Sequence, residues 1–149
     1  MDTTQFPLDF AEFLRSLASK EVEYLLVGGW AVGFHGFPRA TADIDVWVRR
    51  TPANASRIVE ALRLFGFDVP ELNPGLFLEP DRVVRMGLPP FRVEVLTSIS
   101  GVEFEECWSS RVEMVAGDLR VPVLSLEDLK RNKRASGRAK DLADLENLP

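Results

Sequence analysis

The chain has little of what would tie it to a disulfide scaffold, a zinc site or a membrane. Its 149 residues include one cysteine, Cys107, which excludes an internal disulfide and a cysteine cluster for zinc, and which is typical of a reducing compartment. No apolar run approaches the roughly 20 residues that span a bilayer, and the first residues lack the basic flank and apolar stretch of a signal peptide. We therefore expect a cytoplasmic protein with no membrane partner.

Neither sign of charge dominates strongly, and no repeat, low-complexity tract or linker divides the chain. The net charge of −5 argues against a generic nucleic-acid binder. A length of 149 residues is enough to bury one core, so we predict a single domain over residues 1–149. Basic side chains gather near the C-terminus, where they predict either a solvated helix face or a wall that receives phosphates; they are Lys130, Arg131, Lys133, Arg134, Arg138 and Lys140.

The spacing of apolar and turn-forming residues predicts an α/β fold, with a small mixed sheet flanked by helices. Thr51 and Ser125 are expected as helix N-caps, and Gly66 is expected to end a helix. The predicted helices cover residues 7–18, 31–35, 52–65, 125–135 and 138–148. The predicted strands cover residues 24–27, 41–48, 67–69, 76–78, 83–86 and 91–96, followed by a hairpin of 111–115 and 119–123.

The clearest functional signal is a pair of aspartates within a β-branched run. Strand side chains alternate between faces, so Asp43 and Asp45 project together while Ile44 and Val46 face the other way. Aspartate is depleted in strands, and two adjacent carboxylates repel each other unless a cation lies between them. Divalent metals take oxygen ligands of this kind. The pair therefore predicts a metal site, and the alternative is two surface aspartates on an edge strand or in a turn.

The strand at residues 91–96 offers a third carboxylate. Its valines share one face, and Glu94 lies on the other face with Arg92. If this strand neighbours the aspartate strand, three carboxylates meet and can hold two divalent ions for phosphoryl transfer. The alternative is that Glu94 is the cross-strand partner of an arginine such as Arg92 or Arg111.

Two glycines follow the first short apolar strand. Gly28 and Gly29 predict a tight turn that needs positive φ at a strand-to-helix junction. Such a junction lets a phosphate approach backbone N–H groups. A glycine pair alone is a weak signal, but the following Asp-x-Asp strand makes the combination strong.

Together these segments resemble the nucleotidyltransferase superfamily of the DNA polymerase β type. The similarity lies in Gly28-Gly29, in residues 39–45 (RATADID) and in residues 92–96 (RVEVL). Residues 133–145 (KRASGRAKDLADL) are similar to a branch of small bacterial proteins that includes the abortive-infection toxin nucleotidyltransferases of toxin–antitoxin systems. The resemblance spans nearly the whole chain and implies a nucleotidyltransferase-like fold.

The resemblance implies a role for each matching residue. Gly28 and Gly29 would hold a nucleoside triphosphate through backbone N–H groups, and Asp43 and Asp45 would bind Mg²⁺ (or Mn²⁺). Glu94 would be the third metal-binding and catalytic carboxylate, helping to deprotonate the acceptor hydroxyl. Two positions depart from the family pattern. Gly29 stands where serine is common, so a hydroxyl contact to phosphate is missing, and Glu94 stands where aspartate is frequent.

Further residues complete the expected nucleotide site. Lys133 matches the family lysine that contacts phosphate, and Lys140 and Asp141 match its Lys-Asp pair. Asp141 and Asp144 share one face of a predicted helix, so the alternative is that they form salt bridges with Lys133, Arg138 or Lys140 that pin the last two helices together. In the strand region, Thr41 shares the aspartate face and is expected to line the site, Arg39 to orient an acid or a phosphate, and Trp47 to stack a base or pack.

These inferences give one leading hypothesis and two alternatives. The leading hypothesis is a Mg²⁺-dependent nucleotidyltransferase that moves a nucleotidyl group from a nucleoside triphosphate to a hydroxyl acceptor, either an RNA such as tRNA or a small molecule. The branch resemblance adds a toxin role with a cognate antitoxin protein as partner. The first alternative is a catalytically degenerate binding or interaction module on the same fold. The second is another Asp-x-Asp enzyme, which Val46-Trp47 and the short chain disfavour.

Overall fold

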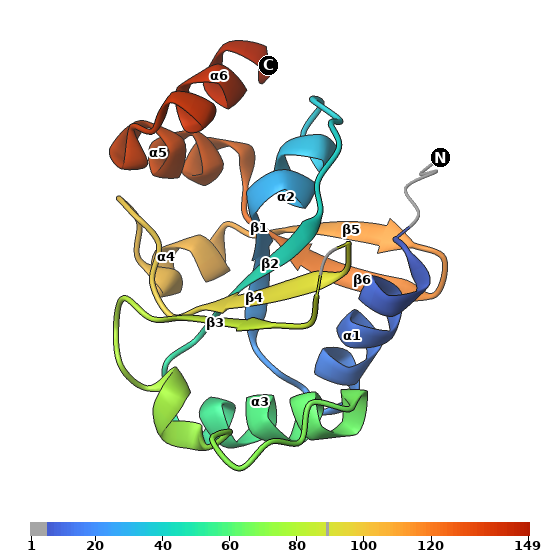
Figure 1. Ribbon diagram of the computed structural model, residues 1–149. Coiled ribbons are helices and arrows are strands. Elements are labelled where there is room, and N and C mark those ends of the chain that lie inside the picture. The colour runs from blue at the N-terminus through green and yellow to red at the C-terminus, as the bar shows by residue number, and fades with distance from the viewer. Residues whose placement is uncertain (1–5, 89) are drawn as a thin grey trace.

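The computed structural model describes residues 6–88 and 90–149, and these form a six-stranded sheet with helices packed around it (Figure 1). The strand order is β3-β4-β2-β1-β6-β5. Strand pairs β1–β2, β3–β4 and β5–β6 are antiparallel, whereas β2–β4 and β1–β6 are parallel. The predicted mixed sheet is therefore confirmed, and its strands are β1 (Tyr24–Val27), β2 (Asp43–Val48), β3 (Val83–Met86), β4 (Arg92–Leu96), β5 (Val112–Ala116) and β6 (Leu119–Val123).

Helices begin where the capping residues predict. The Thr51 hydroxyl accepts a hydrogen bond from Asn54 N at 3.2 Å, and the Ser125 hydroxyl accepts one from Asp128 N at 3.2 Å. Gly66 ends its helix with φ 120°. The α-helices are α1 (Leu8–Ser19), α2 (Gly28–Phe34), α3 (Pro52–Phe65), α4 (Phe104–Ser109), α5 (Leu126–Ser136) and α6 (Ala139–Asn147).

Three local predictions are wrong. Residues 67–69 form no strand, and residues 76–78 belong to a 3-10 turn, η1 (Pro74–Phe77), and its end. Prolines in this region remove the N–H donors that a strand ladder needs, and the Asn73 side chain caps the turn by accepting from Gly75 N at 2.9 Å. Helix α2 starts at Gly28 rather than at Ala31, because the glycines enter the helix directly from β1.

The sheet has one apolar face and one polar face in its central strands. Ile44 and Val46 are fully buried on the face that includes Val93, the strand partner of Ile44. Val93 lines a groove together with Phe10 of α1 and Phe65 of α3. The apolar face is therefore covered by α1 and α3, and the opposite face of the same strands is left for polar side chains. The pair α5–α6 lies at the far end of the molecule from α3 (Figure 1).

The ends of β1 and β2 are held together by one buried side chain from α3. Asn54 is 1% exposed; its Oδ1 accepts from Glu23 N at 2.8 Å, and its Nδ2 donates to Glu23 O at 3.0 Å and Arg49 O at 2.9 Å. A buried amide that satisfies several backbone groups is costly to lose. This contact locks the register of the strands that carry the site.

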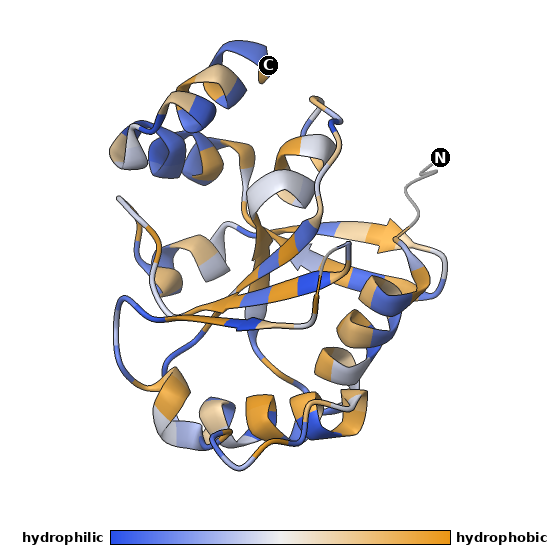
Figure 2. Ribbon diagram, in the orientation of Figure 1, coloured by the Kyte–Doolittle hydropathy of each residue, from blue (hydrophilic) through white to orange (hydrophobic). Residues whose placement is uncertain are grey.

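Hydropathy differs between the sheet and the C-terminal helices. Hydrophobic and hydrophilic residues alternate along the central strands, whereas hydrophilic residues cover much of α5 (Figure 2). Within the described part of the chain, no helix has the length and apolar character needed to cross a bilayer.

Candidate active site

The parallel pairing of β2 with β4 brings the predicted carboxylates together. Asp45 lies directly opposite Glu94 in the register, and Asp43 lies opposite Arg92. Since side chains alternate along a strand, all four project from the same face of the sheet. The condition that the sequence left open is met, since β4 neighbours the aspartate strand and the three acids share one face.

Two arginines neutralise two of these acids. Arg92 binds both oxygens of Asp43, from Nε at 3.2 Å and Nη2 at 3.0 Å. Arg85, on the neighbouring strand β3, donates from Nε to Glu94 Oε2 at 2.7 Å. A cross-strand arginine for Glu94 was one expected alternative, but neither expected partner provides it, since Arg92 binds Asp43 and Arg111 lies over the Trp108 ring at 3.9 Å.

Asp45 differs from its two neighbours because no arginine binds it. Among the described residues, its Oδ1 is buried without a hydrogen-bond partner. Burial, followed by the adjacent Glu94 carboxylate and the charge of Asp43, raises the pKa of Asp45 to about 7, and the nearby Lys140 opposes this rise. The site therefore contains one carboxyl group that no arginine of the described residues binds and whose charged form Lys140 favours.

The glycine pair is required by close contacts as well as by backbone conformation. Gly28 adopts φ 69°, and a Cβ at this position would lie 2.1 Å from Asp45 Oδ2. A Cβ on Gly29 would lie 2.8 Å from the Thr41 hydroxyl, which itself donates to Asp43 O at 3.1 Å. Both glycines therefore let the start of α2 approach Asp45 and Thr41, and Thr41 occupies the space that a serine at position 29 would need.

A cleft of about 680 Å³ opens over this face of the sheet. It is lined by every residue of the predicted site except Asp141, and also by Arg85, Arg138 and the 98–100 segment. A larger groove of about 780 Å³ lies between α1 and α3 on the opposite face and is lined by none of the predicted site residues. Because Asp43, Asp45 and Glu94 line the smaller, polar cleft, that cleft is the candidate active site.

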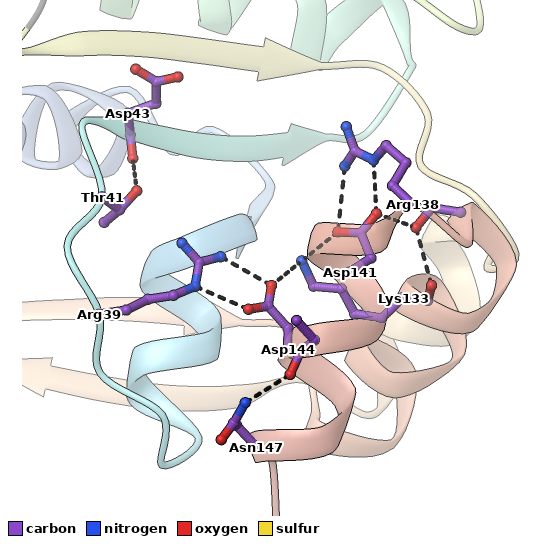
Figure 3. A network of polar contacts seen from close by, with 10 residues as sticks. Arg39, Thr41, Asp43, Lys133, Arg138, Asp141, Asp144 and Asn147 are labelled. Carbon is purple, nitrogen blue, oxygen red and sulfur yellow. Dashed lines mark hydrogen bonds and ion pairs between the residues drawn. The ribbon is translucent and has the colours of Figure 1, made fainter.

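Behind the cleft, a chain of ion pairs connects α6 to α5 and to the loop before β2 (Figure 3). Lys133 Nζ lies 3.1 Å from both Asp141 Oδ1 and Asp144 Oδ2, and Arg39 binds both oxygens of Asp144 at 3.0 Å. Arg138 Nε lies 2.7 Å from Asp141 Oδ2. The salt-bridge alternative for Asp141 and Asp144 is thus what the structure shows, and Arg39 orients an acid.

Burial shapes the charges in this network. Asp141 is 1% exposed, which alone would raise its pKa, but hydrogen bonds from Arg138, Ser136 and Lys133 hold the pKa of Asp141 at about 2. The ammonium of Lys133 is engaged by two carboxylates at the back of the cleft. Lys140, in contrast, is exposed, lines the cleft and forms no ion pair with the described residues.

Trp47 shares the strand face of the aspartates but does not face the cleft. It is 2% exposed and packs edge-on against Phe104 of α4, with ring centroids 5.1 Å apart. Of the two expected roles, base stacking or packing, the structure shows packing.

The carboxylate oxygens of Asp43, Asp45 and Glu94 are donors of the type that a hard divalent cation takes, although the three side chains do not converge on one metal position. In the described part of the chain, no group of three or more acid, histidine or cysteine side chains is close enough to hold a metal ion together. The orphaned Asp45 Oδ1 and the adjacent Asp43 nevertheless supply carboxylate oxygens of the type that Mg²⁺ prefers. The arginines bound to Asp43 and Glu94 would then orient the ligands, as outer partners of metal-binding carboxylates do.

Sequence reasoning missed Arg85 and the 98–100 segment as cleft residues. Residue 85 falls on a predicted strand, so the alternation of side chains along that strand could have indicated the face on which Arg85 lies. What the sequence lacked was the pairing of β3 with β4, which places Arg85 opposite Glu94.

Comparison with known proteins agrees with the geometry. A family model described as "Nucleotidyltransferase of unknown function (DUF6036)" matches residues 8–148, so the chain belongs to this nucleotidyltransferase family. A solved structure from Thermotoga maritima, the protein TM1012, which is provisionally described as a nucleotidyltransferase, matches with a TM-score of 0.63 and 17% identity. The match covers 92% of this chain and 88% of that chain, and it shows a shared fold. No curated protein matches the chain.

These matches confirm two sequence-based predictions, namely the α/β nucleotidyltransferase-like fold and the resemblance to nucleotidyltransferases. The assignment of individual site residues stays a prediction.

Proposed function

We propose that the protein is a Mg²⁺-dependent nucleotidyltransferase that moves a nucleotidyl group from a nucleoside triphosphate to a hydroxyl acceptor. The observation that carries this proposal is the register of β2 and β4, which places Asp43, Asp45 and Glu94 on one face beneath the cleft. Membership in a nucleotidyltransferase family supports it. Three carboxylates beside a glycine turn suit phosphoryl transfer better than any other chemistry of this cleft.

In the proposed reaction, the acceptor oxygen attacks the α-phosphorus, and the bond from that phosphorus to the β-phosphate oxygen breaks. Pyrophosphate leaves, and the acceptor proton passes to the Asp45–Glu94 pair, whose members lie opposite each other in the register. Bound Mg²⁺ would supply charge neutralisation of the triphosphate.

Basic side chains across the cleft support the same reaction. Lys140 lies close enough to Asp45 to lower its pKa, and the charges of Asp45 and Glu94 raise the pKa of Arg138 after the larger effect of Asp141. Cations placed there stabilise the developing charge on a leaving pyrophosphate. Lys133 and Asp141 contribute through the ion pairs that hold α5 and α6.

The deciding experiment measures incorporation of each α-³²P-labelled nucleoside triphosphate into RNA, protein and small-molecule pools, with Mg²⁺ or with EDTA. The wild type is compared with Asp43→Asn and Asp45→Asn, and with Asp68→Asn as a control on an exposed acid that does not line the cleft. We expect label in one pool that disappears with EDTA and in both cleft variants but persists in the control. Transfer that survives in Asp43→Asn and Asp45→Asn would overturn the mechanism.

A second candidate function is a non-catalytic binding module, and the two arginines favour it. Arg92 and Arg85 already neutralise Asp43 and Glu94, so two of the three acids are balanced without a metal. No label in any pool, together with intact nucleotide binding, would support this candidate.

The proposal includes a biological setting, which the sequence resemblance supports: a cytoplasmic toxin restrained by a cognate antitoxin protein. Growth arrest on expression of the wild type, but not of Asp45→Asn, would support the toxin role, and unimpaired growth would count against it.

A further inference from the structure

The arginine at the edge of the sheet, Arg85, is placed differently from every other basic residue of the cleft. It lies on β3, the outermost strand on this side, and its side chain is 59% exposed, whereas the Glu94 side chain that it contacts is 15% exposed. Among the described residues its side chain makes one hydrogen bond, from Nε to Glu94 Oε2. Arg85 lines the cleft, and the two Nη groups of its guanidinium have no acceptor among the described residues.

The registers arrange the site as a single row across four adjacent strands. Val27 pairs with Asp45, Asp45 pairs with Glu94, and Glu94 pairs with Arg85. Gly28 follows Val27, so the glycine turn stands at one end of the row and Arg85 at the other. The two acids that would handle the reacting atoms lie between these ends.

This order gives the proposed reaction a direction, and the argument rests on the proposed function. In an in-line displacement, the attacking oxygen and the leaving oxygen lie on opposite sides of the phosphorus. If the triphosphate lies against Gly28 and Gly29, the acceptor hydroxyl must arrive from the side of Glu94 and Arg85.

We propose that Arg85 binds a phosphate group of the acceptor, and hence that the accepting hydroxyl belongs to a phosphate-bearing molecule. A guanidinium presents a planar fork of donors that matches phosphate oxygens. Glu94 holds Nε of Arg85 and thereby aims the remaining donors, so that the fork is oriented before the acceptor arrives. The same chemistry is offered by the end of an RNA chain and by a small phosphorylated molecule.

The test is a binding measurement that needs no turnover. The probes are a fluorescein-labelled RNA hexamer, ribose 5-phosphate and ribose as competitors, and a fluorescent nucleoside triphosphate with Mg²⁺. Arg85→Gln is compared with Arg82→Gln, a neighbouring exposed arginine that pairs with Glu79 and does not line the cleft. A third variant, Arg85→Lys, keeps the positive charge but lacks the planar guanidinium donors that match phosphate oxygens.

We expect Arg85→Gln to weaken hexamer binding at least tenfold, which corresponds to about 1.4 kcal/mol, and Arg85→Lys to weaken it less. Nucleotide binding should stay within twofold of the wild type in both, and Arg82→Gln should change neither. Competition by ribose 5-phosphate but not ribose would identify the small phosphorylated acceptor, and absence of competition by both would identify the RNA.

The proposal is overturned if the wild type binds neither the hexamer nor ribose 5-phosphate, or if Arg85→Gln binds both as well as the wild type does. It is also overturned if Arg85→Gln loses as much affinity for the nucleotide as for the hexamer. Failure of the proposed function is a separate result, namely no transfer by the wild type while the Arg85-dependent phosphate binding persists.

Discussion

At the residue scale, the site depends on the close approach of Gly28 to the Asp45 carboxylate, which leaves no room for a Cβ at position 28. Gly28 and Gly117 share a left-handed conformation, with φ 69° and φ 64°. A Cβ at Gly28 would meet Asp45 Oδ2 at 2.1 Å, whereas one at Gly117 would meet none of the described residues within 4 Å. Substituting each glycine therefore distinguishes the cost of backbone strain, which both positions share, from the cost of the steric clash, which only position 28 has.

We expect Gly117→Ala to lower the free energy of unfolding by about 1 kcal/mol, the cost of a left-handed alanine, and to leave nucleotide transfer intact. Gly28→Ala should lower it by about 2–4 kcal/mol, because Asp45 must also move, and should abolish transfer. Urea unfolding and the labelling assay measure the two effects. Equal losses of stability in the two variants would show that the contact with Asp45 is unimportant.

Asp45 also makes stability depend on pH. Its pKa is about 7 in the folded protein and near 3.8 in an unstructured chain, so the folded state binds the proton more tightly. The contribution of this group is therefore fully present below about pH 4 and is lost as the pH rises toward 7.

Asp45→Asn keeps this position neutral at every pH. With EDTA present, we expect the variant to be more stable than the wild type by about 2–4 kcal/mol at pH 8, and to lose this advantage as the pH falls to about 4. Asp43→Asn, which breaks the pair with Arg92, should gain no such stability. Parallel pH–stability curves for wild type and Asp45→Asn would contradict the raised pKa.

At the scale of elements, α6 is held by charge and little by apolar packing. The residues that it buries are Asp141 and Asp144, in contrast to α3, which buries Ile58 and Leu62 among others. Directional ion pairs fix the rotation of a helix more tightly than an apolar stripe does. The placement of Lys140 over the cleft follows from that rotation.

Removal of Asp144 should therefore release α6. We expect Asp144→Ala to cost about 3 kcal/mol, since it leaves Lys133 and Arg39 without their shared partner, and to expose the C-terminal helix to proteolysis. Glu146→Ala, at an exposed position of the same helix, should stay within about 0.5 kcal/mol of the wild type. Limited proteolysis and urea unfolding would test this, and similar behaviour of the two variants would argue against the ion-pair attachment.

At the scale of the whole molecule, the strand order joins the two halves of the chain. The late strand β6 pairs with the first strand, β1, so the C-terminal hairpin β5–β6 extends the sheet that the N-terminal strands form. A sheet shared in this way predicts cooperative unfolding.

We expect a single urea transition that coincides by far-ultraviolet circular dichroism and by tryptophan fluorescence. The three tryptophans report from different places, since Trp30 lies in α2, Trp47 in β2 and Trp108 in α4. Two separated transitions, or midpoints that differ between the probes, would show that the predicted single domain over residues 1–149 is wrong.

The sequence predicted the features that depend on residues close together in the chain. Strand alternation was enough to put Asp43 and Asp45 on one face, and hydroxyl caps at Thr51 and Ser125 marked helix starts, because both depend on residues a few positions apart. Short apolar runs between prolines were wrongly predicted as strands, as at residues 76–78. The apolar pattern of a strand does not show whether its backbone N–H groups find hydrogen-bond partners.

Only the tertiary structure decided which charges meet. Arg92 faces Asp43, Arg85 faces Glu94, and Asp45 alone lies without an arginine, because strand order and register set these pairs and neither is written in local spacing. The same holds for Lys133, which the sequence placed on phosphate and the packing of α6 placed between two aspartates. The sequence determined which groups the site has, and the registers of four strands determined which of them remain available to a substrate.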